Sequence, residues 1–226
     1  MSDARAAILA KMRAAMGRGR DDDARRAAVT DRLQRSPRGL IPARGQLDPA
    51  GRIALFCEMA EKVQASIARL PGSADVPAAV SDYLKSKNLP ARVRTGADTR
   101  LADLPWQGQA HLEVAKGPAQ ADDMASVSHA LGGVAETGTL MLTSGPDNPT
   151  TLNFVPEHHI VVLRAADIAG DYETLWDRVR EIHGKGVMPR TVNLVTGPSR
   201  SADIEQTLLL GAHGPRALHI LVVDDV

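Results

Sequence analysis

Four apolar or β-branched runs in the second half of the chain constrain its fold most strongly. They lie at residues 139–143, 160–163, 191–196 and 218–223. Helical patterns over residues 171–183 and 201–210 separate the last three runs. Parallel strands need crossover connections, which are usually helices, so this alternation is typical of a parallel sheet. The pattern therefore predicts an α/β fold with a mainly parallel sheet covered by helices.

The first half of the chain is predicted to be mainly helical. Helical patterns cover residues 3–16, 22–34, 48–70 and 76–87, followed by short strands at 92–94 and 111–115 and a short helix at 122–130. Asp48 and Pro49 form an N-cap and first-turn proline pair that opens the third helix. Pro71 and Gly72 are expected to end that helix at about residue 70.

A proline- and glycine-bearing stretch at residues 36–42 divides a basic segment from the rest of the chain. Residues 1–52 carry twelve Lys or Arg against six Asp or Glu, a net charge of +6, and the remainder carries −6 because the whole chain is neutral. We expect residues 1–38 to form a basic helical appendage and residues 39–226 to form the α/β domain. Aromatic residues make up 3% of the chain, too few for base stacking, so nucleic-acid binding is not expected. Docking on an acidic partner, or on the acidic remainder of the chain, stays open.

Composition and motif spacing exclude several other classes of protein. No apolar run approaches the roughly 18 residues that span a bilayer, and the N-terminus lacks a signal-peptide core, so a cytoplasmic protein without a membrane partner is expected. The single cysteine, Cys57, lies in an apolar helical pattern and is expected to be a buried, inert thiol. One thiol cannot hold an iron–sulfur cluster, which needs about four ligands. His158 and His159 would point to opposite faces of a strand, so no metal site is predicted.

Three polar, glycine-bearing loops lie beside the apolar runs and could meet at one rim of the sheet. The first contains Glu136, Gly138 and Thr139, the second Gly197, Ser199, Arg200, Ser201 and Asp203, and the third His213 and Gly214. A helix beginning near Ser199 or Ser201 would direct free N–H groups at an anion, and Arg200 could bind a carboxylate or phosphate. In the alternative reading the loop is a capped helix start in which Arg200 pairs with Asp203 or Glu205.

Glu136 is the candidate catalytic residue. A carboxylate in a glycine turn can act as a nucleophile or a proton acceptor, although it can equally hold the turn by accepting backbone N–H bonds. His213 could bind a substrate or satisfy a backbone carbonyl. Gly133 and Gly138 have the spacing of a phosphate-binding loop, but Thr139 stands where that loop requires Lys, so ATP binding by this route is not expected.

Four motifs, taken in order, resemble the lactate utilization protein C family, whose characteristic unit is the lactate utilization (LUD) domain. They are Glu136-Thr137-Gly138-Thr139, Pro156-Glu157-His158-His159-Ile160, Gly197-Pro198-Ser199-Arg200-Ser201-Ala202-Asp203-Ile204-Glu205 and Gly211-Ala212-His213-Gly214-Pro215. The resemblance covers roughly residues 40–226. It departs from the family at Ser201, where Thr is common, and at Ala212, where Val is common.

The resemblance implies a sugar-isomerase and CoA-transferase-like α/β fold. It also implies that the chain acts with two iron–sulfur partner proteins in oxidising L-lactate to pyruvate. Lactate oxidation releases two electrons, and the sequence shows neither a cluster motif nor a nucleotide fingerprint. We therefore expect a non-redox subunit that holds no cofactor itself and binds a small anionic ligand. Two alternatives are a transferase or isomerase that uses Glu136, and a protein that only regulates or scaffolds the pathway.

Overall fold

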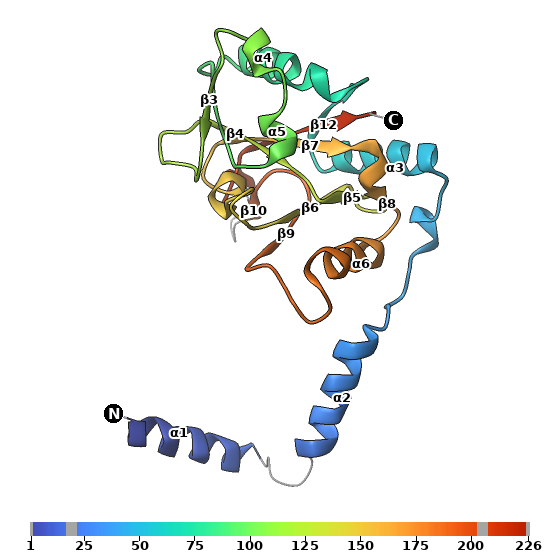
Figure 1. The fold of residues 1–226 in the computed structure, drawn as a ribbon, viewed down its shortest axis with the longest axis vertical. Helices are drawn as coiled ribbons and strands as arrows, with labels where there is room; N and C mark the ends of the chain where they lie inside the picture. Colours follow the sequence, from blue (N-terminus) through green and yellow to red (C-terminus); the bar gives the residue numbers. More distant parts are fainter. Residues whose placement is uncertain (1, 17–21, 203–207, 225–226) are drawn as a thin grey trace.

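A six-stranded parallel sheet forms the centre of the molecule (Figure 1). The computed structural model describes residues 2–16, 22–202 and 208–224. The strand order is β1-β12-β7-β4-β2-β3, and every neighbouring pair is parallel. These strands are β1 (Ser66–Leu70), β2 (Arg92–Thr95), β3 (Glu113–Lys116), β4 (Ala125–His129), β7 (His158–Arg164) and β12 (Ala217–Val223). The expected α/β fold with a mainly parallel sheet is confirmed.

A second sheet, of order β8-β5-β6-β9, packs against one face of the first and is antiparallel except for its β5–β8 pair. Its strands are β5 (Gly132–Val134), β6 (Thr139–Thr143), β8 (Ile168–Ala169) and β9 (Val192–Val195), and a separate pair consists of β10 (Arg200–Ala202) and β11 (Leu208–Leu210). The runs at 139–143 and 191–196 therefore do not lie in the parallel sheet. The turn between β5 and β6 is too short for a crossover, so β6 folds back antiparallel.

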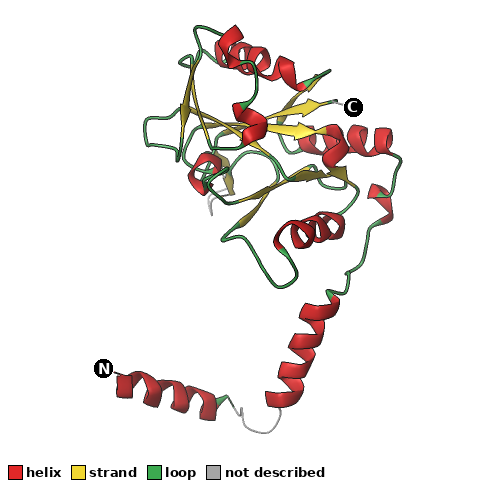
Figure 2. Cartoon of the chain, in the orientation of Figure 1, coloured by secondary structure: helices red, strands yellow, loops and turns green. Residues whose placement is uncertain are grey.

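Helices cover both sheets (Figure 2). Those that pack on the sheets are α3 (Pro49–Lys62), α4 (Val76–Ser86), α5 (Thr99–Ala102) and α6 (Tyr172–His183), and they are preceded in the chain by α1 (Ser2–Ala15) and α2 (Asp22–Arg35). Side chains of α4 and α5 pack on one face of the parallel sheet, while α3 and β6 share the opposite face. In β6, Leu140 and Leu142 face the parallel sheet, whereas Met141 faces α6. This alternation lets one strand contribute to two cores.

The prediction of a helix that runs to residue 70 is wrong beyond Lys62, where α3 ends. The N-cap prediction holds, because the Asp48 carboxylate accepts a hydrogen bond from the Gly51 N–H at 2.7 Å. Gln64 then adopts a φ of +69°, which stops helical winding. Residues Ser66–Leu70 then form β1, which pairs in parallel with β12 at the edge of the central sheet.

The helix expected at 122–130 is also wrong, since this segment contains β4, a fully buried central strand. Its neighbours β2 and β7 satisfy the strand's backbone on both sides. Its polar side chains have partners as well: Ser126 Oγ donates to the Leu152 carbonyl at 2.6 Å, and Ser128 Oγ lies 3.1 Å from His159 Nε2. Tertiary contacts therefore override the local pattern, which has few apolar residues.

The helix expected at 201–210 is likewise contradicted at both ends. Arg200–Ala202 and Leu208–Leu210 pair as antiparallel strands, with Arg200 opposite Leu210. Asp203 and Glu205 lie outside the described residues. Ser199 and Ser201, where the helix is expected to begin, therefore present no helix N-terminus to an anion.

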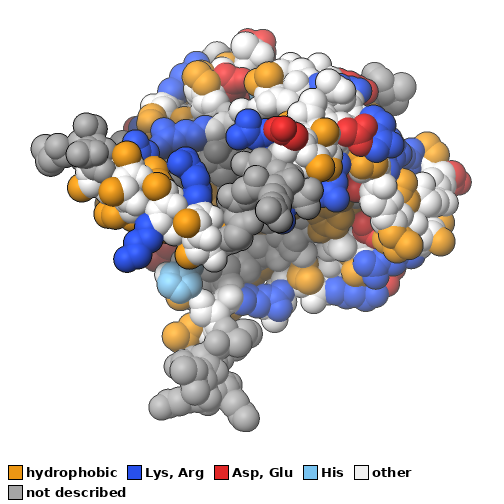
Figure 3. Space-filling view, turned by 90° about the horizontal axis from the view of Figure 1, so that it is seen from below, with side chains coloured by type: hydrophobic (Ala, Val, Ile, Leu, Met, Phe, Trp, Pro, Cys, Tyr) orange, Lys and Arg blue, Asp and Glu red, His pale blue; other side chains and the backbone are white. Residues whose placement is uncertain are grey.

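The N-terminal helices α1 and α2 extend away from the sheets (Figure 1). Their apolar side chains are exposed, among them Ile8, Met12, Val29 and Leu33. Figure 3 views the molecule from this end, where hydrophobic and basic side chains share the surface. After α2, Arg38 pairs with Asp177 of α6. The domain boundary at residue 38 stays a prediction.

Among the described residues, no helix is both long and apolar enough to cross a membrane.

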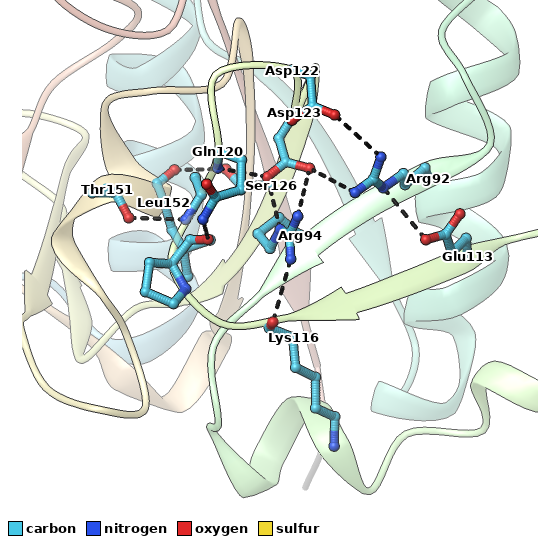
Figure 4. A network of polar contacts seen from close by, with 12 residues as sticks. Arg92, Arg94, Glu113, Lys116, Gln120, Asp122, Asp123, Ser126, Thr151 and Leu152 are labelled. Carbon is cyan, nitrogen blue, oxygen red and sulfur yellow. Dashed lines mark hydrogen bonds and ion pairs between the residues drawn. The ribbon is translucent and has the colours of Figure 1, made fainter.

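A network of charged side chains anchors the loop before β4 (Figure 4). Arg94 donates to both carboxylate oxygens of Asp123, at 2.7 and 3.2 Å, and Gln120 N donates at 2.8 Å. The Asp123 side chain is only 1% exposed. Burial alone would raise the pKa of Asp123, but the bonds from Arg94 and the Gln120 backbone hold that pKa below its usual value. This network fixes β2 to the loop that leads into the central strand.

Replacing Asp123 by Ala should lower the free energy of unfolding by about 3–5 kcal/mol, because it leaves the buried end of Arg94 without its counter-charge. Asp122→Ala is the matched control: this neighbour is 72% exposed and lies 3.6 Å from Arg92, so the loss should be about 1 kcal/mol or less. Urea denaturation of both variants measures the difference. Equal losses would contradict the assigned role of Asp123.

Candidate ligand-binding site

A cavity of about 260 Å³ lies at the amino ends of β7 and β12. Five of the residues expected to form a site line it: Gly197, Ser199, Arg200, His213 and Gly214. The structure thus brings together the second and third of the three glycine-bearing loops. Backbone bonds join these two loops, since Ser199 N donates to the Pro215 carbonyl at 2.8 Å and Gly211 N donates to the Ser199 carbonyl at 3.0 Å.

Gly197 sets the position of the second loop against α3. Its φ is +74°, and a Cβ at this position would collide with the carbonyl oxygen of Val63, the C-cap residue of α3. Arg200 reaches the same place, because its Nη2 donates to the Val63 carbonyl. The guanidinium therefore caps the end of α3 and also lines the cavity. Ser201, which is in β10, does not line the cavity.

Two buried side chains that sequence reasoning missed, His159 and Asn153, form a wall of the cavity. They are 1% and 2% exposed. Ser128 Oγ lies 3.1 Å from His159 Nε2 and donates to Asn153 Oδ1 at 3.4 Å. His159 Nδ1 and Asn153 Nδ2 have no hydrogen-bond partner. Leaving a buried polar atom unpaired costs about 1–3 kcal/mol, so two such atoms at one cavity indicate a place prepared for a ligand.

The protonation state of His159 follows from its burial, which lowers its pKa to about 3. The ring is therefore neutral at pH 7. If Ser128 donates its hydroxyl proton to Asn153, His159 donates from Nε2 to Ser128, and Nδ1 keeps a lone pair. These two residues of the wall then carry one unpartnered acceptor, His159 Nδ1, and one unpartnered donor, Asn153 Nδ2.

His158 and His159 point to opposite faces of β7, as the strand pattern predicts. His158 Nδ1 bonds the Tyr83 hydroxyl at 2.9 Å on the α4 side. His159 shares the other face with Val161 and Leu163, which are core residues. The sequence signal for His159 was thus a polar residue at an apolar position of the alternation. Within the described part of the chain, no group of three or more His, Cys, Asp or Glu could hold a metal ion.

The first loop does not line the cavity but packs against residues that support it. Thr139 is fully buried, and its Oγ1 lies 2.7 Å from Thr196 Oγ1 and 2.8 Å from the Tyr172 hydroxyl. Gly138 has a φ of +65°, and a Cβ there would collide with the backbone of Ala60 in α3. Gly138 and Thr139 therefore hold the loop against α3 and against Thr196, which does line the cavity.

Glu136 does not line this cavity and is only 3% exposed. Its Oε2 lies 3.7 Å from Arg44 Nε and makes no hydrogen bond. Burial raises the pKa of Glu136, Arg44 opposes that shift and Asp171 adds to it. The candidate catalytic residue and the cavity are thus separate features of the molecule.

Comparison with known proteins identifies the domain. Residues 119–223 match the model of the LUD domain, and every residue that lines the cavity falls within this span. The fold is also that of a crystal structure of a DUF162 family protein from Deinococcus radiodurans, with a TM-score of 0.58 and 22% identity over 78% of this chain and 99% of that one.

Curated relatives match segments of similar length. Lactate utilization protein C of Bacillus subtilis is 38% identical over 93 residues, 40% of this chain and 39% of that protein. The protein of the same name from Shouchella clausii is 33% identical over 92 residues, 41% and 40% of the two chains. An uncharacterised protein of Neisseria meningitidis serogroup B is 40% identical over 99 residues, 44% and 42% of the two chains.

Residues 119–223 thus match the LUD domain and the chain is similar to Lactate utilization protein C, so the resemblance seen in its motifs is confirmed. The matches span about two fifths of the length of these relatives.

The buried histidines should make stability depend on pH. Burial lowers the pKa of His159 to about 3 and that of His219 to about 4, whereas an unfolded His has a pKa near 6.5. Below pH 6.5 the unfolded chain therefore binds more protons, and the free energy of unfolding falls as pH drops toward 4.

His219→Gln should reduce this slope, because Gln retains a polar contact to Ser66 without titrating. Urea denaturation at pH 7 and pH 4.5, for the wild-type chain and the variant, measures the two slopes. Carboxylates contribute equally to both chains and cancel in the comparison. Identical slopes would show that His219 is not held neutral.

Proposed function

We propose that this LUD domain binds a small 2-hydroxy carboxylate, L-lactate, and serves as the non-redox subunit of an L-lactate-oxidising system. The observation that carries the proposal is the pair of unpartnered buried atoms, His159 Nδ1 and Asn153 Nδ2, in the same cavity as Arg200. The names of the relatives that match the chain supply the pathway.

The chemistry of the cavity matches the groups of a 2-hydroxy acid. A hydroxyl group donates one hydrogen bond and accepts others, so it can satisfy His159 Nδ1 and Asn153 Nδ2 together. The carboxylate can bind Arg200, whose side chain is exposed and carries donors beyond the one given to Val63. Leu194, Val195 and Leu218 provide an apolar wall for the methyl group.

The electrons released by lactate oxidation would pass to partner proteins. The oxidation needs a two-electron acceptor, and Cys57 alone cannot ligate a cluster. We assign the iron–sulfur clusters to two partner proteins, for which this chain binds or positions the substrate. The test combines the chain with the two partners and follows lactate-dependent dye reduction. Full activity of the partners without this chain, or of this chain alone, would overturn the assignment.

Arg200→Ala should weaken L-lactate binding about tenfold, since a charge-assisted hydrogen bond contributes about 1.5–3 kcal/mol. Arg216→Ala is the matched control, because Arg216 is also exposed but pairs with Glu157 and does not line the cavity. Calorimetric titration with L-lactate and with propionate, which lacks the hydroxyl, measures both effects. Equal affinity for the two acids would show that His159 and Asn153 do not bind the hydroxyl group of lactate.

A second candidate function, acid–base or nucleophilic catalysis by Glu136, has one observation in its favour: the carboxylate is buried, has a raised pKa and keeps one oxygen without a hydrogen bond. Glu136→Gln discriminates between the two functions. If the chain acts through the cavity that Arg200 and His159 line, the lactate cavity, the variant should bind lactate within about twofold of the wild type and retain pathway activity. Loss of turnover with an intact fold would favour catalysis by Glu136.

Alanine at both Arg200 and His213 tests the remaining possibility, that the chain only regulates or scaffolds. Unchanged pathway flux in that double variant would support a scaffold and contradict substrate binding at this cavity.

A further inference from the structure

The parallel sheet has a topological switch point between β2 and β4. From β2 the chain continues to its outer neighbour β3, whereas from β4 it continues to β7 on the other side. Because these connections leave in opposite directions, the carboxyl ends of β2 and β4 open a crevice, the usual ligand position in α/β sheets. A cavity of about 640 Å³ lies there, at the opposite end of the strands from the lactate cavity.

His129, the last residue of β4, presents a hydrogen-bond acceptor at this second cavity. It is 6% exposed, and its Nδ1 lies 2.8 Å from the Ala130 carbonyl oxygen. A carbonyl only accepts, so the ring proton is on Nδ1 and Nε2 carries a lone pair. Burial lowers the pKa of His129, which keeps the ring in this neutral form.

Asn148 presents a second acceptor. It is 6% exposed and lines the same cavity. Its Nδ2 donates to the Thr143 carbonyl at 3.3 Å, which fixes the amide orientation and leaves Oδ1 buried without a partner. The loop that carries Asn148 rests on Gly96, directly after β2, where a Cβ would collide with the Asp147 carbonyl. The switch point therefore holds this acceptor in place by backbone packing.

Two of the charged groups beside these acceptors, Asp98 and Arg100, neutralise each other. Asp98 accepts from Arg100 Nε at 3.0 Å, from Arg100 Nη2 at 2.6 Å and from Arg100 N at 2.9 Å. These bonds from Arg100 outweigh burial and hold the pKa of Asp98 below its usual value. The cavity thus offers the unpartnered Asn148 Oδ1, the Nε2 lone pair of His129 and the carboxylate of the exposed Asp147, beside a compensated ion pair. Its chemistry selects a ligand that supplies several hydrogen-bond donors.

From this arrangement we infer that the switch-point cavity is a second ligand site, which takes an uncharged polyhydroxylated molecule through His129 Nε2 and Asn148 Oδ1. Two adjacent hydroxyl groups of a polyol would donate to these two acceptors. Thr99 and Ser144, which also line the cavity, provide hydroxyl partners for the other oxygens. The site is independent of the lactate cavity and of the function proposed for it.

The test is an amide NMR titration of the full chain with D-sorbitol, which carries six hydroxyl groups and no charge. Triethylene glycol dimethyl ether has oxygen acceptors but no donors and serves as the first control; ethylammonium, a charged donor, is the second. Sorbitol should shift resonances around residues 96–100 and 144–148, and neither control should do so. Absence of sorbitol shifts there, or equal shifts with the ether, would overturn the site, and binding of ethylammonium alone would overturn its ligand class.

Variants separate this site from the lactate cavity. Asn148→Ser and His129→Gln should each weaken sorbitol binding at least fivefold, while Arg200→Ala should leave it unchanged. If either variant fails to fold, the ¹⁵N resonance of His129 Nε2 in the wild-type chain gives the answer, because it must move when a hydroxyl donates to it. An immobile resonance under saturating sorbitol contradicts the inference, whatever the outcome of the lactate titration.

Discussion

The C-terminal end of α3 is the contact on which the rest of the structure depends. Gly138 and Gly197 both press their backbones against it, at positions where any side chain would collide with Ala60 or Val63. Arg200 donates to the Val63 carbonyl, and Thr139 joins Thr196 across the two loops. These contacts fix the second sheet to the first through α3. Because α3 shares its core with β6, β7 and β12, the wall of the cavity at the amino ends of β7 and β12 inherits the rigidity of the hydrophobic core.

The two cavities occupy opposite ends of the parallel sheet and differ in their chemistry. The cavity at the amino ends of β7 and β12 combines a cation, Arg200, with a donor and an acceptor, as a hydroxy acid requires. The cavity at the carboxyl ends of β2 and β4 pairs Asp98 with Arg100 and offers hydrogen-bond acceptors. Only the first lies wholly within the segment that matches the LUD domain. The second needs Asp98 and Arg100 from the preceding part of the chain.

Sequence reasoning located features that depend on neighbouring residues. The Asp48 cap, the α4 and α6 helices and the strands at β7 and β12 all follow from local patterns that tertiary packing reinforces. It failed at β4, since Ser126 and Ser128 are acceptable in a buried strand only because distant groups accept their hydroxyl protons. It also missed Asn153 and His159, whose significance is the absence of a partner, a property that no sequence displays.

The sequence by itself determined the α/β class, the resemblance to the LUD domain and the loops that form one wall of the cavity at the amino ends of β7 and β12, because spacing, turn chemistry and ordered motifs are local properties. Tertiary structure alone decided which loops meet. Gly197 and His213 come together through the bonds between Ser199 and Pro215, while Glu136 turns toward Arg44. It also decided where unpaired buried atoms remain and where the switch point lies. These depend on the spatial order of strands that are distant in sequence, which the periodicity of any single segment does not specify.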